Sequence, residues 1–407
     1  MGAFLLSQIT QVLTPVVEPD LLGRFQQAAS QFSFLWSLPP PHPRLRVCVV
    51  VPARDEELEL PRLVAALAGQ VGLDGLRLDP EVFEVIILLN NCSDHSATVL
   101  RDLCPKVPLK LHIAEITLEA PEAHVGRARQ ILFDTAYHRF RSIGRADGLI
   151  LTTDADTRPE QDWIWQTCAE FAENVSGVGG RILLEPQERT ALPACVQRLF
   201  LLDVGYRRAL EEMRSLYAPQ SEDPFPRHHQ HYGASLAVTA AAYSKAGGMP
   251  LARSSEDAAL YHAVVASGGR FRHSYRVRVR TSARVLGRAE GGLAFALGSW
   301  RDQVNAGRPV VVESAEHAEE RLGRLGLWCA ARPEIPPPFA LTSTPTSPPL
   351  EHSAELHKTL NQLREKICVL RSISLQERLQ RAARKTGAIP SALRTRAQSD
   401  SRLSRLP

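Results

Sequence analysis

The chain has 407 residues, 44% of them hydrophobic, and a formal net charge of +4 at pH 7. This length and apolar content are enough to fill the core of one large α/β domain with appendages, or of two domains. A net charge this small for the chain's size argues against a nucleic-acid partner.

The cysteines and the hydropathy pattern indicate the compartment. The seven cysteines are scattered singly without a C-x-x-C pair, which argues against a disulfide framework or a zinc site and favours a reducing environment. The N-terminus lacks the pattern of a signal peptide, and the sequence has no run of about 18 apolar residues. We therefore expect a cytoplasmic protein without a membrane span.

Residues 1–43 precede the first clear strand and end in a Pro-rich connector. Their apolar residues recur at helical spacing, at Leu21, Phe25, Ala28, Phe32 and Leu35. We expect a helix that docks on the main domain. A helix that lies in a membrane interface is the alternative, and it would make the protein peripheral at the inner membrane face.

From residue 44 onward, short β-branched runs alternate with amphipathic stretches. Strands are predicted over residues 47–51, 82–89, 109–116, 149–153, 177–184 and 276–280. Helices are predicted over residues 60–69, 124–140, 163–171 and 193–213, and from residues 96 and 256 onward. Repeated strand–helix units of this size predict a mostly parallel sheet with helices on both faces and ligands beyond the carboxyl ends of the strands.

The C-terminal third changes in composition. A helical closing segment is predicted over 306–332, a Pro/Ser/Thr-rich linker over 333–350, and short helices with a basic, disordered tail over 351–407. Five apolar residues follow a heptad pattern: Leu356, Leu360, Leu363, Ile367 and Leu370. This seam predicts weak self-association through residues 351–384, and Ser374 with Glu377 predicts a capping box.

Asp154 and Asp156 directly follow the buried-type strand 149–153. An extended backbone places residues i and i+2 on one face, so both carboxylates can point at one ligand. Paired carboxylates suit a hard divalent cation such as Mn²⁺ or Mg²⁺, which keeps coordination sites for phosphate or water. This D-x-D motif therefore predicts a site for a metal-bound diphosphate.

Further polar motifs follow other predicted strands. Val51-Pro52-Ala53-Arg54-Asp55-Glu56-Glu57 follows the first strand and Asn90-Asn91-Cys92-Ser93-Asp94 the second, while Gly247-Gly248 and Glu256-Asp257 come later. With the D-x-D motif, in this order and at these distances, residues 45–300 resemble the nucleotide-diphospho-sugar glycosyltransferases of family 2. The resemblance implies the GT-A fold over residues 44–305: a mixed, mostly parallel sheet with helices on both faces, extended here by helical N- and C-terminal segments.

The resemblance also implies the donor site. The first motif would lie against the base and ribose, Asp94 would bind the nucleobase edge, and the basic segment near residue 127 would approach the diphosphate or base. The implied donor-binding residues are Pro52, Arg54, Glu56, Asn91, Asp94, Arg127, Arg129 and Asp154. Helix-terminal acids, a helix N-cap at Asp94 and a solvated arginine face are the structural alternatives.

By the same resemblance, Asp154 and Asp156 would bind the cation. Asp257 would be the general base that deprotonates the acceptor hydroxyl, and Glu256 would orient it. Four further residues are candidates for contact with phosphate or acceptor, with a polar loop or surface charge as the alternative: Arg280, Arg284, Arg288 and His231.

The sequence thus predicts a metal-dependent, inverting glycosyltransferase that moves a sugar from a nucleotide diphosphate to a hydroxyl of a small or lipid-linked acceptor. The Q-x-x-R-W motif of processive family members is absent, so polymer export is not expected. A sugar-nucleotide nucleotidyltransferase is disfavoured, because residues 52–55 replace its Gly-rich loop. A non-catalytic sugar-nucleotide-binding scaffold is disfavoured, because all four acids are present. The nucleotide, sugar and acceptor stay open.

Overall fold

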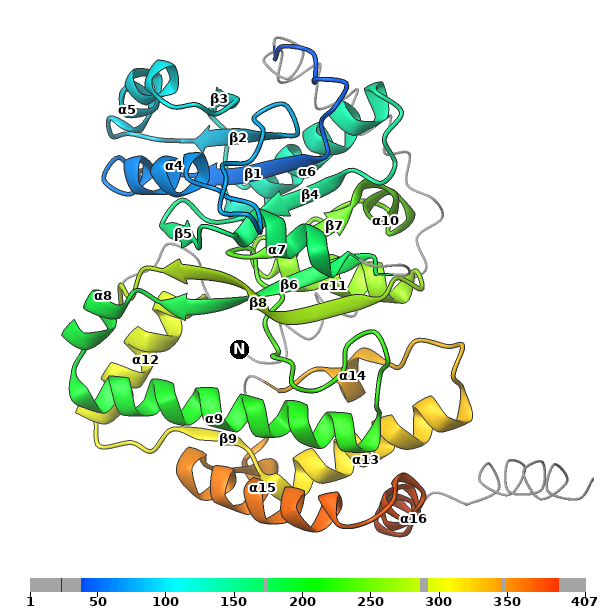
Figure 1. Cartoon of the computed structure of the whole chain (residues 1–407). Coiled ribbons are helices and arrows are strands. Elements are labelled where there is room, and N and C mark those ends of the chain that lie inside the picture. The colour runs from blue at the N-terminus through cyan, green and yellow to red at the C-terminus, as the bar shows by residue number, and fades with distance from the viewer. Residues whose placement is uncertain (1–22, 24–37, 172–174, 286–291, 346–347, 388–407) are drawn as a thin grey trace, which may run out of the picture. The chain divides into compact units, whose positions relative to one another are not determined.

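The computed structural model describes residues 23, 38–171, 175–285, 292–345 and 348–387 (Figure 1). Apart from residue 23, the helix expected before residue 36 lies outside the described residues, as does the basic tail beyond residue 387. The chain divides into two compact units, one of Met1–Leu192 with Gln230–Gly298 and one of Pro193–His229 with Ser299–Pro407. Residues 193–229, which we expected inside the domain 44–305, therefore group with the C-terminal segments.

An eight-stranded sheet forms the centre of the first unit (Figure 1). Its strands, in spatial order, are β3 (Leu111–Ile116), β2 (Phe83–Asn90), β1 (Val47–Ala53), β4 (Leu149–Thr152), β7 (Leu236–Thr239), β6 (Gly177–Leu184), β8 (Phe271–Thr281) and β5 (Thr157–Pro159). The first four strands are parallel, β6 is parallel to β8, and β7 and β5 run antiparallel to their neighbours. The predicted mixed, mostly parallel sheet is confirmed.

Helices pack on both faces of this sheet. In β1, Val47, Val49 and Val51 face a core layer that contains residues of α4 and α7, whereas Cys48 and Val50 face a layer that contains residues of α6 and α11. The alternation follows from the period of two of an extended backbone. The helices of this unit are α4 (Leu60–Ala68), α5 (Ser96–Leu103), η1 (Cys104–Lys106), α6 (Val125–Ser142), α7 (Trp163–Glu170), α8 (Pro186–Ala191), α10 (Ala240–Lys245) and α11 (Glu256–Ala266).

Strand β7 and helix α10 were not expected from the sequence. The four residues Leu236–Thr239 lie between β4 and β6, and they are followed directly by the helix that Thr239 caps through its side chain. A short apolar run among alanines has no period that distinguishes a strand from a helix. These four residues form a strand because they pair antiparallel with β4 on one side and with β6 on the other. This pairing depends on the tertiary structure.

The second unit is mainly helical. Its helices are α9 (Ala194–Tyr217), α13 (Ala315–Ala331), α14 (Phe339–Thr342), η2 (Leu350–His352), α15 (Leu356–Arg371) and α16 (Leu375–Thr386), and α12 (Leu293–Asn305) begins in the first unit and ends in this one. Strands β9 (Val311–Glu313) and β10 (Ser353–Glu355) pair antiparallel. The predicted capping box at Ser374 and Glu377 is confirmed. Within the described ranges, no helix has both the length and the apolar content that a membrane crossing requires.

The predicted heptad seam is part of the core of this unit. Its five residues are at most 4% exposed and pack with α9 and α13 of the same chain. The seam therefore offers no exposed apolar stripe to a second copy, and self-association through residues 351–384 stays a prediction that needs another surface.

A buried ion pair fixes α6 to the sheet of the first unit. Glu84 on β2 accepts hydrogen bonds from Arg139 Nε at 2.5 Å and Nη2 at 2.6 Å, and lies 3.2 Å from His112 Nε2. Burial by itself would raise the pKa of Glu84, but the hydrogen bonds from Arg139 and His112 outweigh it and lower the pKa to about 2.

We expect Glu84→Gln to lower the free energy of unfolding by about 3 kcal/mol near pH 7, because it leaves Arg139 buried without its counter-ion. A carboxyl whose pKa is lowered in the folded state stabilises above its unfolded pKa. The difference between wild type and variant should therefore shrink as pH falls from the ordinary value of 4.5 toward about 2. Urea unfolding at several pH values measures it.

Glu81→Gln is the matched control, because Glu81 pairs with Arg44 at the surface, where an ion pair contributes at most about 1 kcal/mol. Equal urea midpoints for the two variants near pH 7 would contradict the assigned role of Glu84.

Candidate functional site

Strained backbone occurs within two of the predicted motifs and directly before a third. Asp55, Asn91 and Ser255 have φ angles of 51°, 53° and 60°, and they are the non-glycine residues with positive φ in the described part of the chain. Asp55 follows β1, Asn91 follows β2, and Ser255 directly precedes Glu256 at the start of α11. Side chains other than glycine seldom adopt this conformation, and such strain is often found at functional sites.

The D-x-D motif lies in the turn between β4 and β5. The Asp154 side chain is 37% exposed and that of Asp156 is 12% exposed. Each acid contacts a different arginine: Asp154 Oδ1 is 2.6 Å from Arg129 Nη2, and Asp156 Oδ2 is 2.7 Å from Arg284 Nη2. Burial, together with the nearby Asp154, raises the pKa of Asp156 to about 6, although Arg284 opposes the rise.

Arg129 joins two motifs that lie far apart in the sequence. Its guanidinium is almost buried and contacts both Asp154 of the D-x-D motif and Glu256 of the acid pair. Helix α6 carries it there, and Gly126 at the start of that helix allows the approach, because an added Cβ would overlap the carbonyl oxygen of Ala252. The neighbouring Arg127 instead contacts Glu122 and Gln130.

Gly233 completes this junction, although the sequence analysis gave it no role. Its N–H donates to Asp257 Oδ2 at 2.6 Å, and the N–H of Ala258 donates to Oδ1 at 2.7 Å. A Cβ at position 233 would overlap the guanidinium of Arg129, so any larger residue there would require Arg129 to shift. Burial raises the pKa of Asp257, and Arg129 and the two N–H groups oppose the rise. No local pattern in the sequence indicates that this glycine meets α6.

Arg284 connects the loop after β1 to the D-x-D motif. Both of its terminal nitrogens lie 3.1 Å from Glu56 Oε1, and Nη2 also contacts Asp156. Glu56 is 7% exposed, so this predicted donor-binding acid is buried against an arginine that the sequence analysis had assigned to phosphate or acceptor. Arg280 instead pairs with Glu160 at 2.7 Å, and Arg288 lies outside the described residues.

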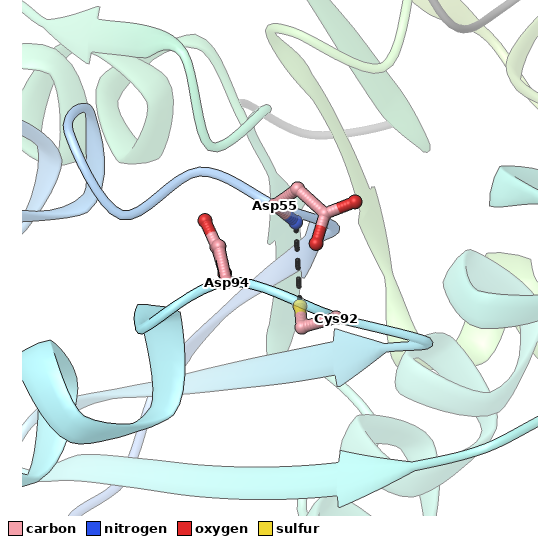
Figure 2. A group of neighbouring side chains, drawn as sticks. All are labelled: Asp55, Cys92 and Asp94. Atoms are coloured by element: carbon pink, nitrogen blue, oxygen red, sulfur yellow. Dashed lines mark hydrogen bonds between the residues drawn. The ribbon is translucent and has the colours of Figure 1, made fainter.

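The loops after β1 and β2 are joined by a group of three side chains (Figure 2). The ligand atoms of Asp55, Cys92 and Asp94 lie within 4.8 Å of one another. Asp55 Oδ1 accepts from the N–H of Ser93, and the two oxygens of Asp94 accept from the N–H groups of Glu57 and Ser96. Their oxygens are thus used to hold the loops together.

The three side chains of this group differ in their acid–base behaviour. Hydrogen bonding, first from the Ser93 backbone, lowers the pKa of Asp55. Burial by itself would raise the pKa of Asp94, but hydrogen bonds from Ser96 and Glu57 outweigh it. Burial raises the pKa of the Cys92 thiol, which favours the protonated form, a poor metal ligand.

The remaining predicted residues lie around these junctions. Pro52 is buried in β1, and the Arg54 side chain is 49% exposed. The side-chain amide of Asn91 bonds both the N–H and the carbonyl of Leu118, so it fixes the following loop. His231 stacks on Tyr261 with ring centroids 3.9 Å apart, and its Nδ1 lies 3.2 Å from His273 Nε2.

The family model described as glycosyl transferase family 2 matches residues 48–223. Residues 48–223 are thus similar to this family. The match includes the loops after β1 and β2 and the D-x-D motif, and it ends before the acid pair at 256–257. Among curated proteins, none matches the sequence of the chain.

Several solved structures of glycosyltransferases are similar at low identity. S. aureus TarS 1–349 in complex with UDP is 13% identical, with 64% of this chain and 72% of that chain covered and a TM-score of 0.40. The mannosyltransferase PcManGT from Pyrobaculum calidifontis, in complex with GDP-Man and Mn²⁺, is 17% identical over 95% of this chain and 90% of that chain, with a TM-score of 0.41. M. tuberculosis glucosyl-3-phosphoglycerate synthase is 15% identical over 66% and 84%, with a TM-score of 0.35. At these values, no residue role carries over to this chain.

We expect Arg129→Met to lower the free energy of unfolding by about 3 kcal/mol, because Asp154 and Glu256 lose their shared counter-ion. Urea unfolding measures the loss. Arg141→Met is the control, since Arg141 lies exposed on the same helix and its replacement should change the stability by no more than about 0.5 kcal/mol. If the two variants were equally stable, Arg129 would not be holding these acids.

Proposed function

We propose that this chain is a glycosyltransferase that moves a sugar from a nucleotide-diphosphate donor to an acceptor hydroxyl. One observation carries the proposal: Arg129 contacts both Asp154 of the D-x-D motif and Glu256 of the acid pair. Arg129 thereby holds an acid of the proposed donor site close to the neighbour of the proposed base Asp257. A transfer requires this proximity, because donor and acceptor must meet at one place. The match of residues 48–223 to the model of glycosyl transferase family 2 supports the same reaction class.

The D-x-D residues fit a divalent cation. Asp154 and Asp156 offer oxygen atoms only, which suits Mn²⁺ or Mg²⁺, and the partly exposed Asp154 leaves room for a ligand from solvent. When bound, such a cation would neutralise charge that develops on the diphosphate leaving group. The Asp55, Cys92 and Asp94 group is the less suitable site, because backbone N–H groups already bind its carboxylates.

For the donor nucleoside we propose the loops after β1 and β2. Arg54 offers a half-exposed guanidinium for the base or phosphate, and Pro52 shapes the strand end. Asn91 and Asp94 serve by fixing these loops, since their side chains bond the main chain. Arg127 stays a candidate for the diphosphate.

Asp257 is the proposed general base. Two backbone N–H groups hold its carboxylate, and burial raises its pKa, which makes it a better proton acceptor than an exposed carboxylate. As the acceptor oxygen bonds to the anomeric carbon, its proton passes to Asp257 and the bond from that carbon to the phosphate oxygen breaks. A single displacement of this kind inverts the anomeric centre. Glu256, paired with Arg129, orients the neighbouring acid.

The acceptor is proposed to be a hydroxyl of a small or lipid-linked compound. His231, in its stack with Tyr261, is the candidate on the acceptor side. A cytoplasmic protein with peripheral contact at the inner membrane face would meet either kind of acceptor.

Donor binding is tested by calorimetry with UDP-, GDP- and dTDP-sugars, each with Mn²⁺ or Mg²⁺. We expect the wild type to bind sugars of one nucleotide in a metal-dependent way. Asp156→Ala should lose at least about tenfold in affinity, because it removes a charged ligand of the cation. Absence of binding by the folded wild type to every donor would contradict the proposed function, whereas donor binding without turnover would favour the non-catalytic sugar-nucleotide-binding scaffold.

Turnover tests the base. Asp257→Asn should lower the rate at which nucleoside diphosphate is released from the bound donor by about 10²- to 10⁴-fold, while the donor affinity changes by less than about twofold. Asp147→Asn is the control, since the Asp147 side chain is 72% exposed and lies in the turn before β4. Unchanged release by Asp257→Asn would exclude Asp257 as the base.

A further inference from the structure

Arg284 already occupies an oxygen of the proposed cation ligand Asp156. Its Nη2 is 2.7 Å from Asp156 Oδ2, and both terminal nitrogens of the same guanidinium donate hydrogen bonds to Glu56 Oε1. Among the described residues, the hydroxyl groups of Thr281 at 3.4 Å and Thr157 at 3.5 Å are the hydrogen-bond partners of the other oxygen of Asp156. The strong contact of this largely buried carboxylate is therefore with an arginine.

A divalent cation and a guanidinium compete for one carboxylate. Placed together on Asp156, they would lie a few ångströms apart in a partly buried site, where like charges repel strongly. Arg284 is thus a tethered cation at the position where a metal ion would bind. Its side chain is 35% exposed, so it can leave Asp156 toward solvent or a ligand.

The backbone that carries Arg284 is held in place. Glu188 Oε2 accepts from both the Ser282 hydroxyl and the N–H of Ala283 at 2.8 Å, and the Ser282 hydroxyl accepts from the N–H of Arg284. The N–H of Ser282 also donates to the carbonyl of Asp156 at 3.2 Å. An exchange of partners therefore needs only a rotation of the Arg284 side chain.

We propose that Arg284 competes with the divalent cation for Asp156, and that the donor's diphosphate relieves this competition by binding the released guanidinium. The inference rests on the proposed function. A planar guanidinium binds phosphate oxygens through two hydrogen bonds, so the diphosphate is a suitable new partner. The cation alone then binds weakly, and cation and nucleotide strengthen each other's binding.

Manganese binding, measured by electron paramagnetic resonance with and without UDP or GDP, tests the competition. Without nucleotide, Arg284→Gln should bind Mn²⁺ about three- to tenfold more tightly than the wild type, because the competing charge is gone. Arg280→Gln is the matched control: it removes a cation from the same strand end, but one that pairs with Glu160, and should leave the Mn²⁺ affinity within about twofold.

The nucleotide supplies the second readout. In the wild type the nucleoside diphosphate should raise the Mn²⁺ affinity, and in Arg284→Gln this increase should be smaller, because no guanidinium is released to the diphosphate. If Arg284→Gln does not fold, Arg284→Lys is used in its place. A lysine contacts one acid at a time and is the weaker competitor, so Mn²⁺ should still bind about two- to threefold more tightly than in the wild type.

The outcomes separate this inference from the proposed function. Equal or weaker Mn²⁺ binding by the folded Arg284 variant, with wild-type binding of Mn²⁺ and nucleotide intact, overturns the competition alone. A wild type that binds no Mn²⁺, with or without nucleotide, overturns the metal-assisted mechanism and the competition together.

Discussion

The candidate site depends on the pairing of buried charge. Asp154 and Glu256 share Arg129, and Asp156 and Glu56 share Arg284. A buried carboxylate without a counter-ion is costly, so an arginine that reaches two acids at once stabilises both of them. Each arginine also joins segments that are distant in the sequence. The same pairs that stabilise the acids therefore hold the loops of the site together.

The sheet determines which loops can meet. β1 lies between β2 and β4, all three parallel, so the loop after β1 and the D-x-D turn leave the same edge of the sheet from neighbouring strands. β5 then pairs antiparallel with the end of β8, which brings the segment around Ser282 against the D-x-D turn. The glycines at 126 and 233 permit the remaining close approaches.

The second unit shows how one pattern can serve two purposes. A heptad spacing of leucines is typical of helices that associate with another copy, and equally of a helix that packs on others in its own chain. Here α15 buries its seam against α9. The two helices are far apart in the sequence, since α9 ends at Tyr217 and α15 begins at Leu356. The pattern fixes which side chains are buried, but it does not identify the partner.

By itself the sequence determined most of the strands and helices of the first unit, the mixed α/β class, the D-x-D motif and the acid pair, because these depend on local periodicity and on motif spacing. It did not show that Arg129 and not Arg127 would pair with the acids of the site, or that Arg284 would pair with both Glu56 and Asp156. It also gave no sign that Gly233 would bond to Asp257. Strand β7 and the partner of the heptad seam were likewise decided by packing. Local patterns report which residues prefer to be buried, extended or helical, whereas ion pairs and close backbone approaches depend on which strands become neighbours, and only the tertiary structure decides that.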